Sequence, residues 1–417
     1  MRVLFTANPE RSPFQYLVPM AWALRTAGHE VRFAGQPGFA ATITGAGLTA
    51  VPVGRDQESW RMSAEMAEAN ATLRAGVPPP YDVVEHPEKL TREYLEPGFE
   101  RAVTWWHKMD NFPMMSGLVD FARAWRPDLV VWDPLNFAGP VAAAVVGAAH
   151  ARLTWGLDVF AVGRGHHLRL RDPGAVDPFA RWLGGQVGAH GLEFTEELVT
   201  GQFTIDQFPA SLQIEADLTY LRTRYVPYGG PAVVPRWLWE KPARPRVAFT
   251  MGVTSTDLFG GYQLGVQEAL DALGELDVEV VATIADSVRD ELKRVPDNTR
   301  IVPYVPLHAL APTLSAIVHH AGAATMATVA LHGVPQLAVP YHFDQPLLGE
   351  LLTAQGAGLS VHAAEATGPI LRESVRRLLE EPRFLAGAER LRAEVAALPS
   401  PNELVRTLEE LTAAHRR

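Results

Sequence analysis

The sequence predicts an α/β protein with two doubly wound, Rossmann-like domains that face each other across a deep cleft. The chain has 417 residues, more than one hydrophobic core usually supports. In both halves, short apolar strand patterns alternate with helical patterns, which is typical of parallel sheets. Between the halves, 223–245 is rich in Pro and Gly and is expected to be the interdomain linker.

The first half, 1–222, opens with a βαβ pattern and is expected to be the N-terminal domain. Strands are predicted at 3–7, 31–34, 49–53, 129–132 and 151–153. Helices are predicted at 14–27, 118–125 and 138–146, and another ends before Gly47. Gly28 can end the first helix in the left-handed conformation that glycine adopts easily.

Between 54 and 116 this periodicity fades, and Met and aromatic residues gather. Such residues form adaptable apolar surfaces, so the segment is expected either to pack as helices over the sheet or to line a pocket for a large apolar ring system. Together with 158–201, it gives a candidate apolar pocket, whose residues are Pro13, Phe14, Met62, Trp106, Met109, Met114 and Phe160.

The second half, 246–400, starts a new βα series and is expected to be the C-terminal domain. Its strands are predicted at 247–250, 278–284, 300–302, 316–318 and 336–339. The last segment, 401–417, is expected to form a helix that packs back on the first domain.

Composition narrows the class of function. The net charge is −10, whereas a nucleic-acid-binding protein usually needs a basic face; solubility alone explains such a charge. The absence of Cys excludes disulfides and thiolate metal sites, as expected in a reducing cytoplasm. The chain shows neither a secretion-signal pattern nor an apolar run of membrane-spanning length. These features predict a cytoplasmic protein without nucleic-acid or membrane partners.

The most informative motif is His319-His320-Ala321-Gly322-Ala323-Ala324-Thr325, which follows a buried strand pattern and precedes a helical one. Free backbone N–H groups and the positive end of the helix dipole favour an anion at such a turn. Thr325 is expected to cap the helix and donate its hydroxyl, and His320 to donate beside a phosphate. His319 is expected to bond a backbone carbonyl at the strand end. Because the chain contains no Asp-x-Asp pair, this site is expected to work without a metal ion.

This motif, with Gly333-Val334-Pro335-Gln336 and Asp344-Gln345, resembles the nucleotide-sugar signature of family-one glycosyltransferases with the GT-B fold. Within that family, the chain resembles bacterial dTDP-deoxysugar transferases of polyketide antibiotic biosynthesis. Further matching blocks lie at 1–5, 17–31, 46–54, 132–135 and 224–231.

The resemblance implies an inverting, metal-independent enzyme that moves a deoxysugar from a dTDP-sugar co-substrate to a polyketide or aromatic acceptor, with no further cofactor. It implies that 1–222 is the acceptor-binding domain, that the candidate apolar pocket is the acceptor pocket, and that 246–400 is the nucleotide-sugar-binding domain. It implies that Tyr304 and Val305 hold the pyrimidine and that Ser255 faces the phosphates. It also implies donor-binding roles for His320, Gly322, Ala323, Ala324 and Thr325 at the diphosphate, and for Asp344 and Gln345 at the sugar hydroxyls. A side-chain cap on the following helix is an alternative or additional role for Asp344.

The catalytic base is left open by the sequence. Many relatives carry a histidine where this chain has Pro13, and proline cannot accept a proton. Asp133, at a strand end, and Glu10, on the loop after the first strand, are the two candidates. Asp133 could instead cap the next helix, and Glu10 could be a solvent-exposed side chain. A third alternative is that an activated acceptor needs no strong base.

Some relatives need a haem-less, cytochrome-related auxiliary protein, so such a partner, or a homodimer, is conceivable by resemblance. A catalytically silent paralogue acting as a binding or auxiliary subunit is the alternative function, although the intact donor motif argues against it. A nucleotide-sugar epimerase is a third alternative, and the large apolar insertion in the first half argues against that class.

Overall fold

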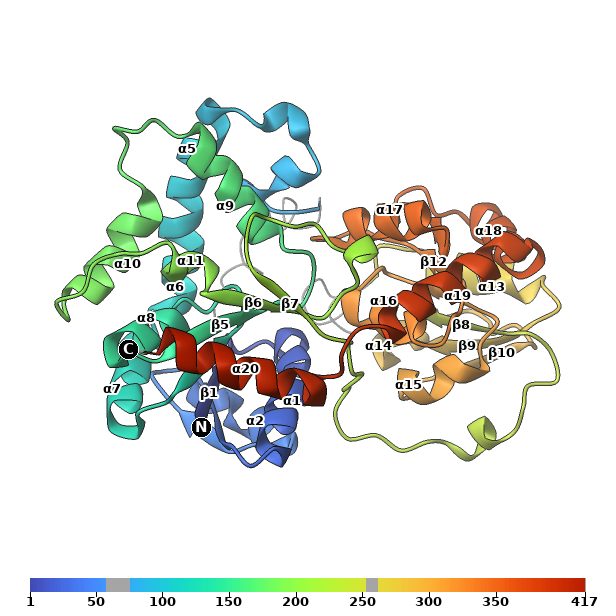
Figure 1. Cartoon of the computed structure of the whole chain (residues 1–417). Helices are drawn as coiled ribbons and strands as arrows, with labels where there is room; N and C mark the ends of the chain where they lie inside the picture. The colour runs from blue at the N-terminus through green and yellow to red at the C-terminus, as the bar shows by residue number, and fades with distance from the viewer. Residues whose placement is uncertain (58–75, 253–261, 417) are drawn as a thin grey trace.

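The computed structural model describes residues 1–57, 76–252 and 262–416. They form two α/β domains that lie side by side, each built around a parallel sheet (Figure 1). Candidate residues Met62 and Ser255 lie outside the described residues. No helix in the described ranges is long and apolar enough to cross a membrane.

The N-terminal sheet has seven parallel strands in the order β3-β2-β1-β4-β5-β6-β7. The strands are β1 Arg2–Thr6, β2 Glu30–Gly35, β3 Ala50–Pro52, β4 Leu129–Trp132, β5 Ala149–Leu153, β6 Phe203–Asp206 and β7 Tyr220–Arg222. The strand order reverses between β1 and β4, and open parallel sheets bind ligands at the carboxyl ends of the strands beside such a point. The loops after β1 and β4 are therefore placed for function.

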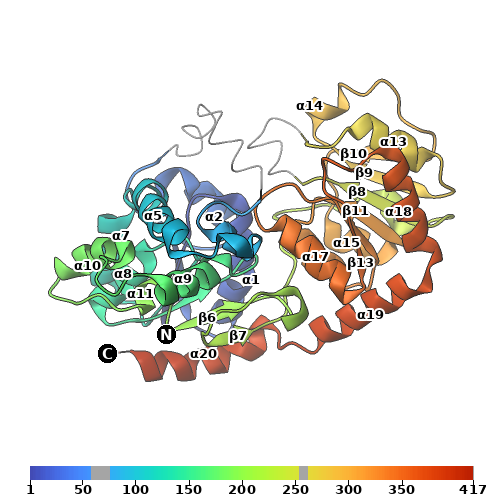
Figure 2. The ribbon, with the colours of Figure 1, turned by 90° about the horizontal axis from the view of Figure 1, so that it is seen from above.

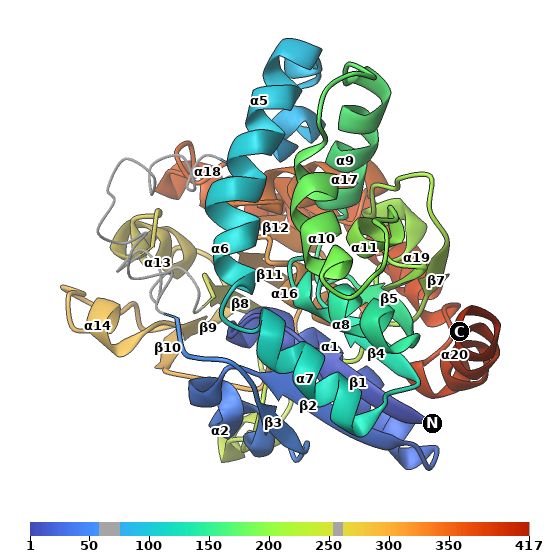
Figure 3. The ribbon, with the colours of Figure 1, turned by 90° about the vertical axis from the view of Figure 1, so that its left-hand side faces the viewer.

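Helices cover this sheet and fill the region where periodicity fades. They are α1 Arg11–Thr26, α2 Ala40–Gly45, α5 Arg92–Ala102, α6 Lys108–Asn111, α7 Met115–Trp125, α8 Ala138–Val146, α9 Val159–Leu170, α10 Pro178–Gly188 and α11 Glu197–Thr200. Short turns are η1 Pro37–Phe39, η2 Tyr81–Val84, η3 Pro87–Lys89, η5 Ala210–Leu212 and the π-helical η4 Val103–His107, which joins α5 to α6. Helices α5 and α9 lie side by side on the outer part of the domain (Figure 3). Gly28 follows α1 with φ +94°, in the left-handed region.

The C-terminal sheet has six parallel strands in the order β10-β9-β8-β11-β12-β13. The strands are β8 Arg246–Thr250, β9 Glu279–Thr283, β10 Thr299–Val302, β11 Ala316–His319, β12 Gln336–Ala338 and β13 Gly358–Ser360. The helices are α13 Val266–Gly274, α14 Asp286–Arg289, α15 Leu307–Leu310, α16 Ala323–Ala330, α17 Gln345–Gln355, α18 Gly368–Glu380 and α19 Pro382–Ala396, with the short turn η7 Ala311–Thr313. Strand β8 pairs with β9 and β11, so the loops after β8 and β11 leave the sheet as neighbours.

The chain crosses between the domains twice. The first crossing is the linker, which holds the short turn η6 Arg236–Trp239. The second leads to α20 Pro401–His415, which packs against α1 and β5 of the N-terminal domain (Figure 2). Ser400 and Glu403 form a capping box that fixes the start of α20. The two crossings meet where the Arg224 N–H donates to the Pro399 carbonyl at 2.7 Å.

Candidate donor and acceptor sites

A cavity of about 250 Å³ lies at the carboxyl ends of β8, β9 and β10 and is lined by the first turns of α16. It brings together four candidate donor residues, namely Tyr304, Val305, Ala324 and Thr325. The Val305 side chain is buried, whereas Tyr304 is 50% exposed. The cavity is thus lined by the loop that carries Tyr304 and Val305 and by the N-terminal part of α16.

Helix α16 begins at Ala323, about one turn before the start that a cap at Thr325 would need. Gly322 is the N-cap, with extended backbone, and it makes no side-chain cap bond. Thr325 is the third helical residue, so the prediction that it caps the helix is wrong. The first intrahelical bond runs from Met326 N–H to the Gly322 carbonyl. The N–H groups of the three helical residues before Met326 therefore have no partner within the helix and can receive an anion.

His320 sits between two glycines. A Cβ built on Gly252 would lie 2.6 Å from its Cε1 atom, and a Cβ on Gly322 would collide with its Nε2 atom. Burial lowers the pKa of His320 to about 4, so the imidazole is neutral near pH 7. A neutral imidazole donates one N–H, and the backbone of Thr250, at the end of β8, is a hydrogen-bond partner of this ring. Donation from His320 to a phosphate therefore stays a prediction.

His319 has a structural role, but its backbone partner differs from the prediction. Its Nδ1 accepts the Ala321 N–H at 3.0 Å instead of donating to a carbonyl, because the backbone turns sharply at Ala321, where φ is +61°. Its other nitrogen, Nε2, then carries the proton and donates to Gln336 Oε1 at 2.9 Å. This fully buried pair fixes the turn that precedes α16.

Asp344 and Gln345 lie at the start of α17, and both are buried. Gln345 Oε1 accepts the Tyr341 and His342 N–H groups, each at 3.3 Å. Asp344 makes no side-chain cap bond, so the capping alternative is wrong. Instead, its Oδ2 accepts the Leu157 N–H of the N-terminal domain at 2.9 Å. Burial raises the pKa of Asp344 to about 7.

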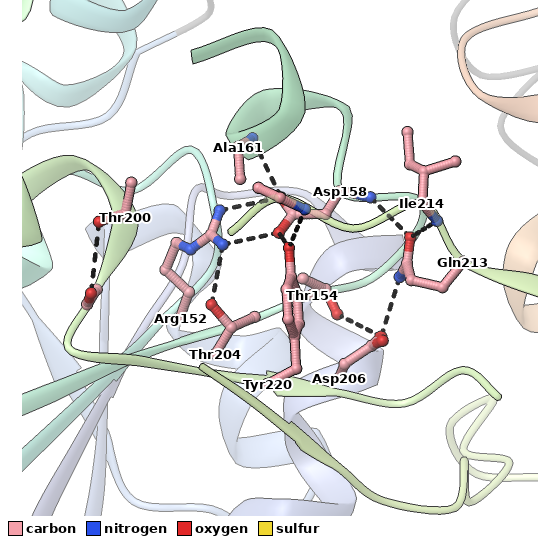
Figure 4. A network of polar contacts seen from close by, with 12 residues as sticks. Arg152, Thr154, Asp158, Ala161, Thr200, Thr204, Asp206, Gln213, Ile214 and Tyr220 are labelled. Carbon is pink, nitrogen blue, oxygen red and sulfur yellow. Dashed lines mark hydrogen bonds and ion pairs between the residues drawn. The ribbon is translucent and has the colours of Figure 1, made fainter. Parts of the chain in front are cut away.

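The loop that meets Asp344 is held by a buried polar network, which the sequence did not reveal (Figure 4). Arg152 forms an ion pair with Asp158 at 2.7 Å, and the Tyr220 hydroxyl donates to the same carboxylate at 2.7 Å. Gln213 accepts the Asp158 N–H at 3.0 Å and donates to Asp206 Oδ1 at 3.1 Å. Polar residues inside β5 and β6 were the only sequence signal for this network.

The two candidate bases, Asp133 and Glu10, differ in how far their side chains are exposed to solvent. Asp133 is 1% exposed, and its two oxygens accept the Asn8 and Leu135 N–H groups, each at 2.9 Å. Burial raises the pKa of Asp133 to about 6. Glu10 is the N-cap residue of α1 but makes no side-chain cap bond, and it is exposed to solvent. Although Glu10 keeps surface in contact with solvent, protein atoms lie close around its carboxyl group, and this desolvation, with the negative charges of Asp133 and Asp110, raises its pKa to about 7.

The candidate acceptor residues separate into core and surface. Phe14 and Met114 are buried in the hydrophobic core, where Phe14 packs edge-on against Phe33 at 5.0 Å. Both side chains thus belong to the core, and their place in an acceptor pocket stays a prediction. Pro13 is likewise buried, in the first turn of α1.

Of the remaining described candidates, Phe160 is also a core residue, whereas Trp106 and Met109 are partly exposed. Trp106 is partly buried and packs 5.9 Å from Phe160, and Phe160 is 8% exposed. Met109 is 41% exposed. Within the described part of the chain, no group of three or more His, Asp or Glu residues could hold a metal ion.

Comparison with known proteins gives a consistent assignment over the whole chain. Residues 22–252 match the model for "Erythromycin biosynthesis protein CIII-like, N-terminal domain", and residues 267–411 match its C-terminal counterpart. The chain is 44% identical to 10-deoxymethynolide desosaminyltransferase of Streptomyces venezuelae, over 100% of this chain and 98% of that protein. It is 42% identical to Aclacinomycin-T 2-deoxy-L-fucose transferase of Streptomyces galilaeus, over 100% of this chain and 97% of that protein.

Among solved structures, the glycosyltransferase VinC in complex with dTDP superposes with a TM-score of 0.88 at 40% identity, covering 99% of this chain and 100% of that one.

Proposed function

Because the chain belongs to the erythromycin biosynthesis protein CIII-like family of GT-B glycosyltransferases, we propose that it transfers a deoxysugar from a dTDP donor to a polyketide or aromatic acceptor. In this proposal, 1–222 binds the acceptor and 246–400 binds the donor. The observation that carries it is the cavity where Tyr304 and Val305 adjoin the N-terminus of α16.

The start of α16 supports departure of the diphosphate without a metal ion. Three N–H groups of the first helical turn point out of the helix, and the dipole adds positive potential there. Fixed donors aimed at developing negative charge are each worth roughly 3 kcal/mol in rate. The acceptor oxygen would attack the anomeric carbon as the bond to the diphosphate breaks, in one displacement that inverts the configuration.

Glu10 is the proposed general base. It combines solvent access with a pKa near the working pH, which suits proton transfer. Asp133 is almost inaccessible and is engaged by backbone N–H groups, so its proposed role is to hold the loops after β1 and β4 and to raise the pKa of Glu10. Glu10 would take the hydroxyl proton of the acceptor as its oxygen attacks.

The rate of transfer is expected to rise with pH. Glu10 is a base only when ionised, so kcat/KM for the acceptor should increase about tenfold per pH unit below about pH 7 and level off above about pH 8. Asp110→Asn removes a like charge facing Glu10 and should move this rise to lower pH. A rise centred near pH 4.5 in the wild type, or no rise, would contradict the assignment. Initial rates between pH 5 and 9 give the measurement.

The overall function is tested by incubating the protein with dTDP-desosamine and 10-deoxymethynolide, and with dTDP-2-deoxy-L-fucose and aclacinomycin T. Transfer is expected with at least one pair, unchanged by EDTA, and with the anomeric configuration inverted by NMR. Loss of activity in EDTA that Mg²⁺ restores, or retained configuration, would refute the mechanism. Donor hydrolysis without acceptor separates an active enzyme from a silent paralogue, which would show neither transfer nor hydrolysis.

A further inference from the structure

One wall of the nucleotide cavity comes from outside the C-terminal domain. Four linker residues line it, which are Tyr225, Pro227, Tyr228 and Gly229. The N-terminal domain contributes one side chain, Gln15 of α1. Gln15 therefore lines the same space as Thr325 and Gly252.

Tyr225 ties α1 to α16 beside this space. Its ring lies 5.4 Å from the ring of Tyr16, which is the residue after Gln15. Its hydroxyl interacts with Thr328, one turn along α16 from Thr325. The Tyr225 side chain is 5% exposed, so both contacts are buried. This contact fixes the part of α1 that carries Gln15 relative to the helix end that receives the anion.

The linker also contacts Tyr304, the residue expected to hold the pyrimidine base. A Cβ on Gly229 would lie 3.2 Å from the Tyr304 hydroxyl, closer than most side-chain contacts, so glycine lets the linker approach Tyr304. A ligand in the cavity is consequently enclosed by both domains and by the segment that joins them.

We propose that Gln15 is a further donor-binding residue, whose carboxamide donates to a diphosphate oxygen on the side opposite α16. An amide offers two N–H donors and no charge, so it adds to the anion-binding groups of α16 without repelling them. Nucleoside diphosphate binding then holds the acceptor domain against the donor domain, so that the reactants meet only in the closed arrangement. This inference rests on the proposed function only in taking the ligand to be dTDP.

The test compares dTDP with thymidine, which lacks the phosphates, by calorimetric titration of full-length variants. Gln15→Ala should weaken dTDP binding about tenfold or more, because a hydrogen bond to a charged group is lost. Gln15→Glu should weaken it further, about a hundredfold, because a carboxylate repels the diphosphate. Thymidine should bind all forms equally. Gln186→Ala, a partly buried helical glutamine of α10 outside the cavity, is the matched control and should bind dTDP as the wild type does.

Wild-type affinity for dTDP in both Gln15 variants would overturn the inference. An equal loss of thymidine binding would overturn it as well, because Gln15 would then only support the cavity. A wild-type protein that binds dTDP but transfers no sugar would refute the proposed function while leaving the Gln15 test intact, whereas no dTDP binding at all would refute both.

Discussion

Glu10→Gln is expected to lower kcat for sugar transfer by roughly 10²–10⁴-fold and to leave the dTDP dissociation constant unchanged. The amide keeps the size of the side chain but cannot accept the acceptor proton. Glu10 belongs to the N-terminal domain and is absent from the lining of the nucleotide cavity, so donor binding should not respond. Single-turnover transfer and calorimetric titration measure the two quantities.

Two further variants, one a control and one that tests the other candidate base, complete this experiment. Glu88→Gln, at an exposed carboxylate of η3, should behave as the wild type. Asp133→Asn distinguishes the alternatives, because activity lost there but kept in Glu10→Gln would make Asp133 the base. Activity kept in both variants would mean that the acceptor needs no strong base.

Gly252→Ala is expected to reduce dTDP affinity about a hundredfold and to destabilise the fold by roughly 1–3 kcal/mol. Gly252 has φ +72°, where side chains are strained, and its new Cβ would lie 2.6 Å from His320 Cε1. The imidazole would have to leave its place beside the start of α16. Titration with dTDP and thermal unfolding report the two effects.

The matched control is Gly185→Ala on α10, where a Cβ meets nothing within 4 Å and φ is not positive. It should bind dTDP normally and melt at or above the wild-type temperature. Unchanged dTDP binding in Gly252→Ala would show that the position of His320 does not matter for the donor.

The pattern of apolar residues along the sequence was enough to locate the central strands of both sheets. Strands β1, β4, β8 and β11 are continuous apolar runs buried on both faces, and such runs stand out in a sequence. Strands β6 and β7 were missed because they are short and carry polar residues such as Asp206 and Arg222, which serve a buried network rather than an apolar face. Strand β13 was missed because it has only three residues and begins with Gly358.

The candidate site was predictable where it depends on one continuous segment. The motif before α16 could be recognised from residues 319–325 alone, although the predicted N-cap was Thr325 and the observed one is Gly322. The contact of Asp344 with Leu157 joins residues 187 positions apart, and no local signal encodes it. The pKa of Glu10 likewise depends on Asp110 and Asp133, which only the folded chain brings near. Burial of Phe14 and Met114 shows that an apolar residue next to a site is more readily core than pocket.

The meeting of the two crossing segments at Arg224 and Pro399 has a practical meaning for labelling. Because α20 packs against α1 and β5, the C-terminus of the chain should move together with the N-terminal domain. A fluorophore at the C-terminus paired with one on α18 should therefore report rotation between the halves, with the pivot at these two connecting segments. The same fluorophore paired with one on α7 should give a constant signal throughout the reaction cycle.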